Sequence, residues 1–174
     1  LSSAEELRQA YSAADLFVHA GRWDRDENLA LRRADQPVAF ADACVEAAAG
    51  LHEATAEELL ADARRRDLRH LDILTIDGST TRDCDDALHI EPQADGTVLV
   101  GIHITDVTHY VPPHGPLFAE ARERATSLYF PENQVPMLPD RLSLEICSLH
   151  LGRVRPSLSF LVTLDREARV RHTT

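Results

Sequence analysis

Four aspartates stand close together in the stretch "TIDGSTTRDCDDALHI", which covers residues 75–90. The four aspartates are Asp77, Asp83, Asp85 and Asp86. Carboxylates held within about 4–6 Å of each other raise one another's pKa values, so keeping all of them ionised costs free energy unless a positive charge compensates. Mg²⁺ is a small, hard cation that binds oxygen ligands and uses few carboxylates, which leaves positions for water and substrate phosphate. The spacing therefore predicts a divalent metal site.

The stretch has room for more than one ion. Two divalent ions about 3.5–4 Å apart can bind the attacking and the leaving oxygen of a phosphodiester. Asp77 follows an apolar run, and a loop of small and polar residues separates it from the other three aspartates. If a strand begins at Asp86, its side chain shares a face with Leu88 and Ile90, while Asp85 points the other way. We therefore expect the carboxylates to surround two ions.

Three alternatives for this acidic stretch differ in the sequence they require. Most acidic loops are solvated turns, but here apolar, β-branched segments flank the loop on both sides. A calcium loop of the EF-hand type requires alternating ligands, a central Gly and a distal Glu, and the stretch lacks this order. A phosphatase with an aspartyl nucleophile usually carries a second Asp two residues after the first, where this chain has Ser79. The divalent metal site is the prediction that the spacing favours.

The first seventy residues have the spacing of helices. Ser3 and Thr55 each begin a capping box, and an apolar face recurs over residues 37–50. The helix that begins after Thr55 is expected to extend into the Arg64–Arg66 run, whose positive charge suits the C-terminal end of a helix. We therefore predict a helical lead-in over residues 1–70.

From Leu71 onwards the pattern changes to that of strands. A short apolar strand is expected in "LDILTI", and a hairpin turn at Asp95-Gly96 joins "ALHIEP" to "TVLVGIHI". A second hairpin is expected from "SLSFLVTL" and "ARVRHT", a short helix from "PLFAEARERA", and a strand from "SLYF". The order predicts an α+β fold, in which the helical lead-in is followed by a mixed, largely antiparallel sheet with flanking helices over residues 71–174.

The composition excludes several classes of protein. The formal net charge is −11, which argues against a sequence-blind nucleic-acid coat because such proteins are basic. No apolar run approaches the roughly 18 residues of a membrane helix, so we expect no membrane partner. The three cysteines are widely spaced, which suits a reducing cytoplasm better than a disulfide framework. We therefore expect a cytoplasmic protein.

Several blocks of the chain, in order, resemble the ribonuclease II / ribonuclease R family. "TIDGSTTRDCDDAL" is similar to the family's T-I-D followed by D-x-D-D-A-L, and "GIHITDVTHYV" to its H-I-A-D-V segment. "RATSLYFPENQVPMLPDRLSLEICSL" is similar to its R-x-T-S-x-Y…P-M-L-P…L-S…C-S-L, and "RRDLRHL" to the lead-in before the site. The resemblance covers roughly Arg65 to Phe160.

This resemblance implies a Mg²⁺-dependent exoribonuclease, with Mn²⁺ as a substitute ion. Such enzymes degrade single-stranded RNA processively from its 3′ end to nucleoside 5′-monophosphates. The resemblance implies that the four aspartates ligate or position the metals, with Asp85 most closely tied to the chemical step, and that Tyr129 stacks on a nucleotide near the 3′ end. Base stacking is worth about 1–3 kcal/mol per base and tolerates any sequence. His103 also lies in a matched block, and there we expect a core residue.

The resemblance also implies that the chain is the N-terminal portion of an RNB-type catalytic domain. The remainder of that domain and an OB-type RNA-binding domain are expected beyond Thr174. Two alternatives therefore stay open, a non-catalytic RNA-binding or regulatory fragment and a metal-stabilised structural domain. Phosphate contact and ion pairing are both open for Arg124, Arg153 and Arg155.

Overall fold

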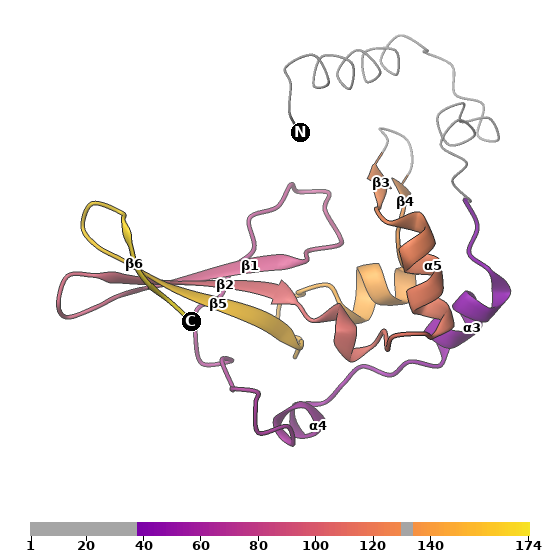
Figure 1. The fold of residues 1–174 in the computed structure, drawn as a ribbon, viewed down its shortest axis with the longest axis horizontal. Coiled ribbons are helices and arrows are strands. Elements are labelled where there is room, and N and C mark those ends of the chain that lie inside the picture. The colour runs from indigo at the N-terminus through magenta and orange to yellow at the C-terminus, as the bar shows by residue number, and fades with distance from the viewer. Residues whose placement is uncertain (1–37, 130–133) are drawn as a thin grey trace, which may run out of the picture. The chain divides into compact units, whose positions relative to one another are not determined.

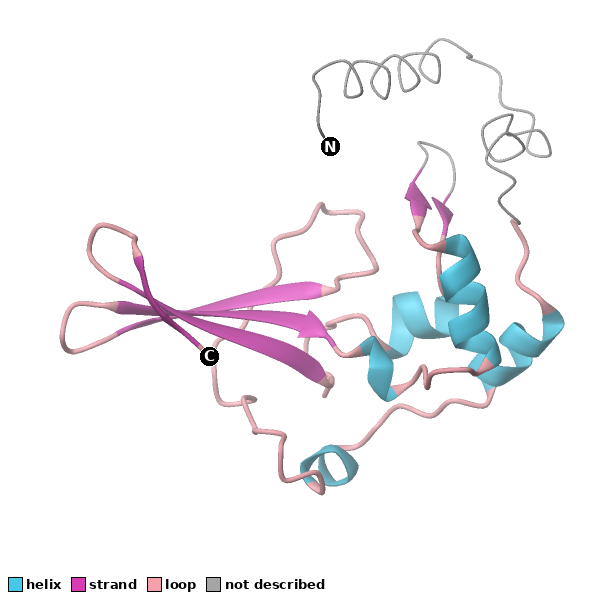
Figure 2. Ribbon diagram, viewed as in Figure 1, coloured by secondary structure: helices cyan, strands magenta, loops and turns pink. Residues whose placement is uncertain are grey.

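The acidic stretch leads into the first strand of a four-stranded sheet. In the computed structural model, which describes residues 38–129 and 134–174, the sheet is formed by β1 (Asp86–Pro92), β2 (Val98–Thr105), β5 (Ser157–Leu164) and β6 (Val170–Thr173). The strands lie in the order β1-β2-β5-β6, and each neighbouring pair is antiparallel (Figure 1). The helices lie beside one end of this sheet (Figure 2). The predicted α+β class with a largely antiparallel sheet is confirmed.

Both expected hairpins are present because their turns supply local hydrogen bonds. In the β1–β2 turn, Asp95 Oδ1 accepts from the backbone N–H of Thr97 at 2.9 Å, and Gly96 has a φ of 85°. That left-handed conformation favours glycine, since a side chain would be strained there. In the β5–β6 turn, Asp165 Oδ1 accepts from the backbone N–H groups of Glu167 and Arg169 at 3.0 and 2.9 Å. Each hairpin is therefore fixed by residues within its own turn.

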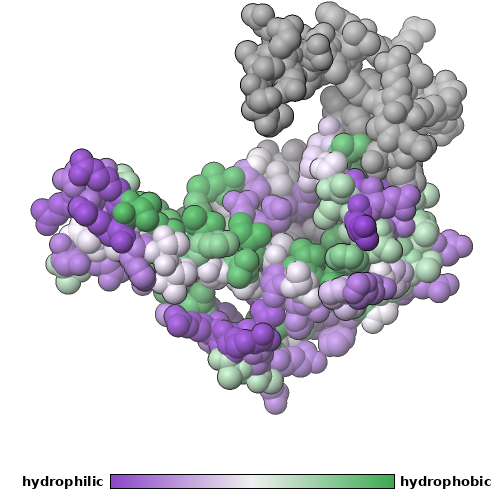
Figure 3. Space-filling model, viewed as in Figure 1, coloured by the Kyte–Doolittle hydropathy of each residue, from purple (hydrophilic) through white to green (hydrophobic). Residues whose placement is uncertain are grey.

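The two faces of the sheet differ in chemistry. Leu88 of β1 lies opposite Ile102 of β2, which in turn lies opposite Phe160 of β5, so the three side chains share one face of the sheet. This face is partly exposed among the described residues, and hydrophobic side chains are visible over the sheet (Figure 3). The opposite face carries a buried pair, in which a ring nitrogen of His89 lies 2.7 Å from one of His103. The expectation that His103 is a core residue agrees with its burial.

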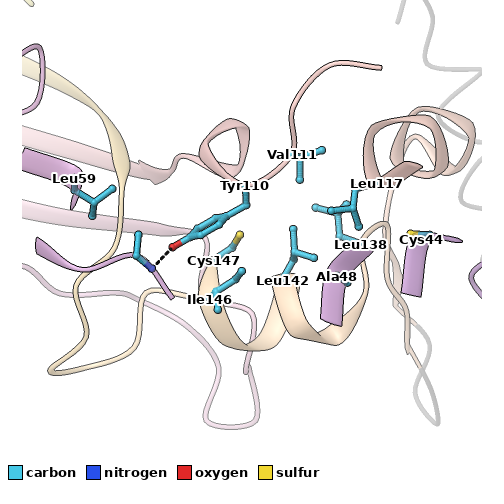
Figure 4. Packing of buried hydrophobic residues seen from close by; sticks show 11 residues of the cluster. Cys44, Ala48, Leu59, Tyr110, Val111, Leu117, Leu138, Leu142, Ile146 and Cys147 are labelled. Atoms are coloured by element: carbon cyan, nitrogen blue, oxygen red, sulfur yellow. Dashed lines mark hydrogen bonds between the residues drawn. The ribbon is translucent and has the colours of Figure 1, made fainter. Parts of the chain in front are cut away.

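The helices form the hydrophobic core. They are α3 (Asp42–Ala49), α4 (Ala56–Leu60), the short 3₁₀ helix η1 (Val107–His109), α5 (Pro116–Arg124) and the π-helix η2 (Arg141–Ile146). Figure 4 shows their buried side chains meeting around Leu142 and Ile146, with Tyr110 among them. The Tyr110 hydroxyl accepts a hydrogen bond from the Ala54 backbone N–H at 3.2 Å, which satisfies its polar end. A small two-stranded sheet, β3 (Leu128–Tyr129) with β4 (Gln134–Val135), follows α5.

The lead-in helices are shorter than expected. The capping box at Thr55 is present, but α4 ends at Leu60, well before the arginine run. The reason is local, because the Asp62 carboxylate accepts from both the backbone and the side chain of Arg64, which favours a turn over a further helical turn. The helix expected over residues 37–50 is observed as Asp42–Ala49, and the one expected after Ser3 lies outside the described residues.

The strand expected in "LDILTI" was predicted wrongly. Only Leu74 pairs, through an isolated bridge to Leu88 with hydrogen bonds of 2.9 and 2.8 Å. The apolar side chains of Ile73 and Ile76 are exposed rather than buried. The segment forms backbone hydrogen bonds with the edge of β1 at Leu74 only. Its apolar, β-branched composition therefore predicted more strand pairing than the structure contains. Asp77 therefore follows an extended segment and not a strand.

Replacing Gly101 by Ala tests the packing of the histidine pair. A Cβ at Gly101 would lie 2.0 Å from Cε1 of His89, whose ring is buried and hydrogen-bonded to His103. We expect Gly101→Ala to lower the free energy of unfolding by about 1–3 kcal/mol. Gly50→Ala is the control, because its nearest atoms would be at 3.7 Å. Urea denaturation measures both, and equal stabilities would contradict the described packing.

Candidate metal and nucleic-acid site

The backbone of the acidic loop, residues 77–86, is attached to two other parts of the chain. The Ser148 hydroxyl donates to the Arg82 carbonyl at 2.8 Å and accepts from the Cys84 N–H at 3.1 Å. The Leu149 N–H donates to the Cys84 carbonyl at 2.8 Å, and the Thr105 N–H donates to the Asp85 carbonyl at 2.9 Å. The loop is therefore held between the end of β2 and the segment that follows η2.

Asp85 lies where negative charge is concentrated. Desolvation by the surrounding protein raises the pKa of its carboxyl group, and the charges of Asp86, Asp83 and Asp77 raise it further. Across residues 38–129 and 134–174, no ion pair joins any of these four carboxylates to an arginine or a histidine. The site therefore carries negative charge that the described protein does not compensate.

Asp83 has a different environment from Asp85. Burial alone would raise the pKa of the Asp83 carboxyl group, but hydrogen bonds from the Tyr129 hydroxyl, from backbone N–H groups and from the Gln134 amide together outweigh it and lower that pKa. The Tyr129 hydroxyl donates to Asp83 Oδ2 at 2.5 Å, and Gln134 Nε2 donates to the same oxygen at 3.0 Å. The hairpin β3–β4 therefore contacts the acidic loop directly.

The two remaining aspartates lie at the ends of the loop. Burial raises the pKa of the Cys84 thiol, and a hydrogen bond with the Asp77 carboxylate raises it further. Asp86 begins β1 opposite Ile104 and is exposed on the same face as Leu88 and Ile90, as the alternation predicts. Both ends of the loop therefore return to one region, and this agrees with the charge effects at Asp85.

The donor set fits a divalent cation in its chemistry. Within the described ranges, no three His, Cys, Asp or Glu side chains are grouped so as to hold a metal ion. Mg²⁺ does not require such a cage, because it is commonly bound by one or two carboxylates together with water and substrate phosphate. Uncompensated carboxylates around Asp85 supply hard oxygen ligands and the charge that such an ion would balance. Which aspartates ligate an ion stays a prediction.

Tyr129 has the exposure that stacking requires. Its side chain is 64% exposed, while its hydroxyl is bound to Asp83. A ring fixed at its polar edge can still present a face to a base. The hydrogen bond to Asp83 and burial raise the pKa of Tyr129 to about 12.

Two of the candidate arginines are structural. Arg124 is 1% exposed, pairs with Glu120 at 2.9 Å and donates to the Ala39 carbonyl at 2.7 Å. Arg155 is paired with Glu53 at 2.6 Å. Arg153 is the more exposed of the three, at 3.7 Å from Glu53. Ion pairing rather than phosphate contact therefore describes Arg124 and Arg155.

Sequence reasoning missed two residues that support the site. Ser148 is buried and binds two backbone groups of the acidic loop. It follows the π-helix η2, where the Cys147 N–H donates to the Leu142 carbonyl, and such irregular turns recur at functional sites. Ser148 lies in the C-S-L block, but it is 64 residues from Cys84, so the sequence near the loop does not indicate this contact. Gln134 is also distant in sequence, 51 residues from Asp83.

The described residues include no helix long and apolar enough to cross a membrane.

Comparison with known proteins identifies the family. Residues 65–174 match the RNB domain. The chain belongs to the RNB-domain family. The resemblance found in the motifs is therefore confirmed, and the acidic loop, β1, β2 and the hairpin β3–β4 all lie inside the matched RNB region.

Similar proteins and similar solved structures agree with this assignment. Exoribonuclease 2 of Edwardsiella piscicida is 48% identical over 107 residues, which are 62% of this chain and 16% of the relative. Mycoplasma genitalium RNase R, solved in complex with ribose methylated single-stranded RNA, is 28% identical with a TM-score of 0.77, over 83% of this chain and 22% of that one. Yeast Ssd1, a pseudonuclease, is 29% identical with a TM-score of 0.59, over 70% of this chain and 15% of that one. The chain thus spans a small part of each.

Titration of Tyr129 tests the contact between the hairpin and the acidic loop. The hydrogen bond to the Asp83 carboxylate, burial and the charge of that carboxylate together raise the pKa of the Tyr129 hydroxyl to about 12. Asp83→Asn removes the charge, so we expect the pKa of Tyr129 to fall towards the ordinary value of about 10. Ultraviolet absorbance of tyrosinate in chelator-treated buffer measures the change. The part of the absorbance that is lost in Tyr129→Phe is the signal of Tyr129. An unchanged titration in Asp83→Asn would contradict the hydrogen bond.

Proposed function

We propose that this chain carries the acidic part of the active site of a Mg²⁺-dependent 3′→5′ exoribonuclease. The proposed reaction is processive, two-metal hydrolysis of single-stranded RNA to nucleoside 5′-monophosphates, with Mn²⁺ as a substitute ion. The observation that carries the proposal is the uncompensated charge around Asp85 within an RNB domain. Relatives named as exoribonucleases support the reaction class.

The four aspartates are proposed to hold the ions and orient the scissile phosphate. A bound divalent ion supplies positive charge that lowers the pKa of water and stabilises a leaving 3′-oxygen. Asp85 is proposed to be closest to the reacting phosphate, because it combines partial desolvation with the repulsion of the other three carboxylates. Ser148 holds the backbone of the loop, so the path of the segment that carries the carboxylates is fixed by the protein itself.

Tyr129 is proposed to hold the 3′-terminal nucleotide by stacking. Its ring is exposed, and its hydroxyl contacts the same loop that carries Asp85. Stacking selects no particular base, which suits an enzyme that must accept every nucleotide. The remaining RNA contacts are proposed to come from the rest of the catalytic domain and from an OB-type domain. This accords with the 15–16% of the relatives' length that the chain spans.

The alternative is a non-catalytic RNA-binding or regulatory role. The resemblance to yeast Ssd1, a pseudonuclease, supports this alternative, because it associates a similar fold with the absence of nuclease activity. Incubation of 3′-labelled single-stranded RNA with Mg²⁺ separates the two roles. Release of labelled mononucleotide by the complete gene product supports hydrolysis, whereas bound but intact RNA supports the alternative.

Asp85→Asn is expected to separate turnover from binding. It removes one negative charge next to the proposed ions with little change in shape, so turnover by the complete gene product should fall at least about 10²-fold. RNA affinity, measured by fluorescence anisotropy, should stay close to that of the parent protein. Asp95→Asn in the β1–β2 turn makes the same chemical change at an exposed position and serves as the control. Equal loss of turnover and binding in Asp85→Asn would contradict the assigned role.

Tyr129→Ala and Tyr129→Phe are expected to differ in RNA affinity. The alanine variant loses the ring, so its Kd for single-stranded RNA should rise roughly 5- to 150-fold, which corresponds to about 1–3 kcal/mol. The phenylalanine variant keeps the ring and should bind RNA like the parent. Anisotropy with a labelled oligoribonucleotide in chelator-treated buffer compares them. Equal affinities for all three proteins would exclude stacking by Tyr129.

A further inference from the structure

The hairpin β3–β4 directs two side chains at one oxygen of the acidic loop. Tyr129 and Gln134 are direct partners across the hairpin. Directly opposed residues of an antiparallel pair project from the same face, with Cβ atoms about 4.5–5.5 Å apart. Their polar ends meet at Asp83 Oδ2, at 2.5 Å for the hydroxyl and 3.0 Å for the amide. One cross-strand pair thus supplies two donors to one carboxylate oxygen.

The hairpin that carries this pair is itself fixed to the body of the protein. Val135 in β4 is buried, and the Met137 N–H donates to the Ser127 hydroxyl at 2.9 Å, which closes the base of the hairpin. Arg124, buried in α5, donates to the carbonyl of Pro136 at 3.4 Å. The two donors therefore approach Asp83 from a supported element and not from a free loop.

We propose that Gln134 and the hydroxyl of Tyr129 are positioning groups for Asp83, which hold its carboxylate in the orientation that binds a divalent ion. The inference rests on the proposed function, since it assumes that the acidic loop binds such ions. A carboxylate whose orientation is already fixed by hydrogen bonds loses less rotamer freedom when it binds a metal. The same contact joins the aromatic ring proposed to stack on RNA to the loop proposed to hold the metal.

The two roles of Tyr129 use different parts of the side chain. Stacking uses the exposed face of the ring, whereas positioning uses the hydroxyl that donates to Asp83. Tyr129→Phe should therefore keep RNA affinity and weaken metal binding. Gln134 has no ring, so its replacement should affect the metal without a loss of base stacking. Weaker metal binding with unchanged RNA affinity in both variants distinguishes positioning from a general disturbance of the site.

Mn²⁺ affinity, measured by electron paramagnetic resonance of the free ion, tests the proposal without relying on activity. Groups that orient metal ligands typically contribute 10–100-fold to affinity, so the Kd should rise about tenfold in Gln134→Leu and in Tyr129→Phe. Gln93→Leu is the matched control, because Gln93 is exposed near the β1–β2 turn and donates to the Glu91 carbonyl. It should bind Mn²⁺ like the parent.

A double-mutant comparison assigns the effect to Asp83. In an Asp83→Asn background, Gln134→Leu should change the Mn²⁺ affinity by less than about twofold, because the oriented carboxylate is already absent. Thermal melting without metal shows whether each variant folds. If Gln134→Leu does not fold, Tyr129→Phe still decides, since it removes one oxygen from an exposed ring.

The outcomes separate the inference from the proposed function. A parent protein that binds no Mn²⁺ would overturn the proposed metal site and the inference with it. A parent that binds Mn²⁺ together with variants of equal affinity would overturn the positioning role alone. Tighter binding in either variant would also overturn it, since the hairpin would then compete with the ion for Asp83. Weaker binding in both variants, with the control unchanged, is the expected result.

Discussion

The central physical constraint in this protein is negative charge that the described residues leave uncompensated. Two partly buried carboxylates elsewhere in the described chain have arginine partners. Asp106 pairs with Arg65 at 2.7 Å and Glu53 with Arg155 at 2.6 Å, and the pKa of each of these carboxyl groups is lowered. At Asp85 the direction is reversed, because desolvation and three neighbouring carboxylates raise the pKa. None of the four loop carboxylates has an arginine or histidine partner among the described residues, and we propose that a cation from solution balances their charge.

The fold holds these carboxylates near one another through contacts that are distant in sequence. The acidic loop is attached to the end of β2, to Ser148 after the π-helix, and to the hairpin β3–β4. Backbone attachment fixes the path of the loop, while Tyr129 and Gln134 act on the Asp83 side chain. The helical core around Leu142 and Ile146 supports the segment that carries Ser148. Stability of the core and geometry of the site are therefore linked through η2.

Sequence predicted the features that depend on neighbouring residues. Both sheet hairpins follow from turn chemistry at Asp95-Gly96 and at Asp165, and the capping box at Thr55 is specified within four residues. The strand expected at residues 71–76 failed because pairing depends on a partner edge, and β1 offers that segment one bridge. The roles of Ser148 and Gln134 depend on contacts 64 and 51 residues away, for which one sequence contains no local signal. The four aspartates could be chosen as candidates because their spacing is local, and their role as metal ligands stays a prediction.

The most direct test of the central claim is anomalous X-ray diffraction from crystals of the complete gene product grown with Mn²⁺ and a short single-stranded RNA. The account predicts Mn²⁺ density in contact with carboxylate oxygens of the acidic loop and with the terminal phosphate of the RNA. Crystals in which the RNA is bound beside the loop, while the carboxylates of residues 77, 83, 85 and 86 face solvent with no Mn²⁺ among them, would contradict it.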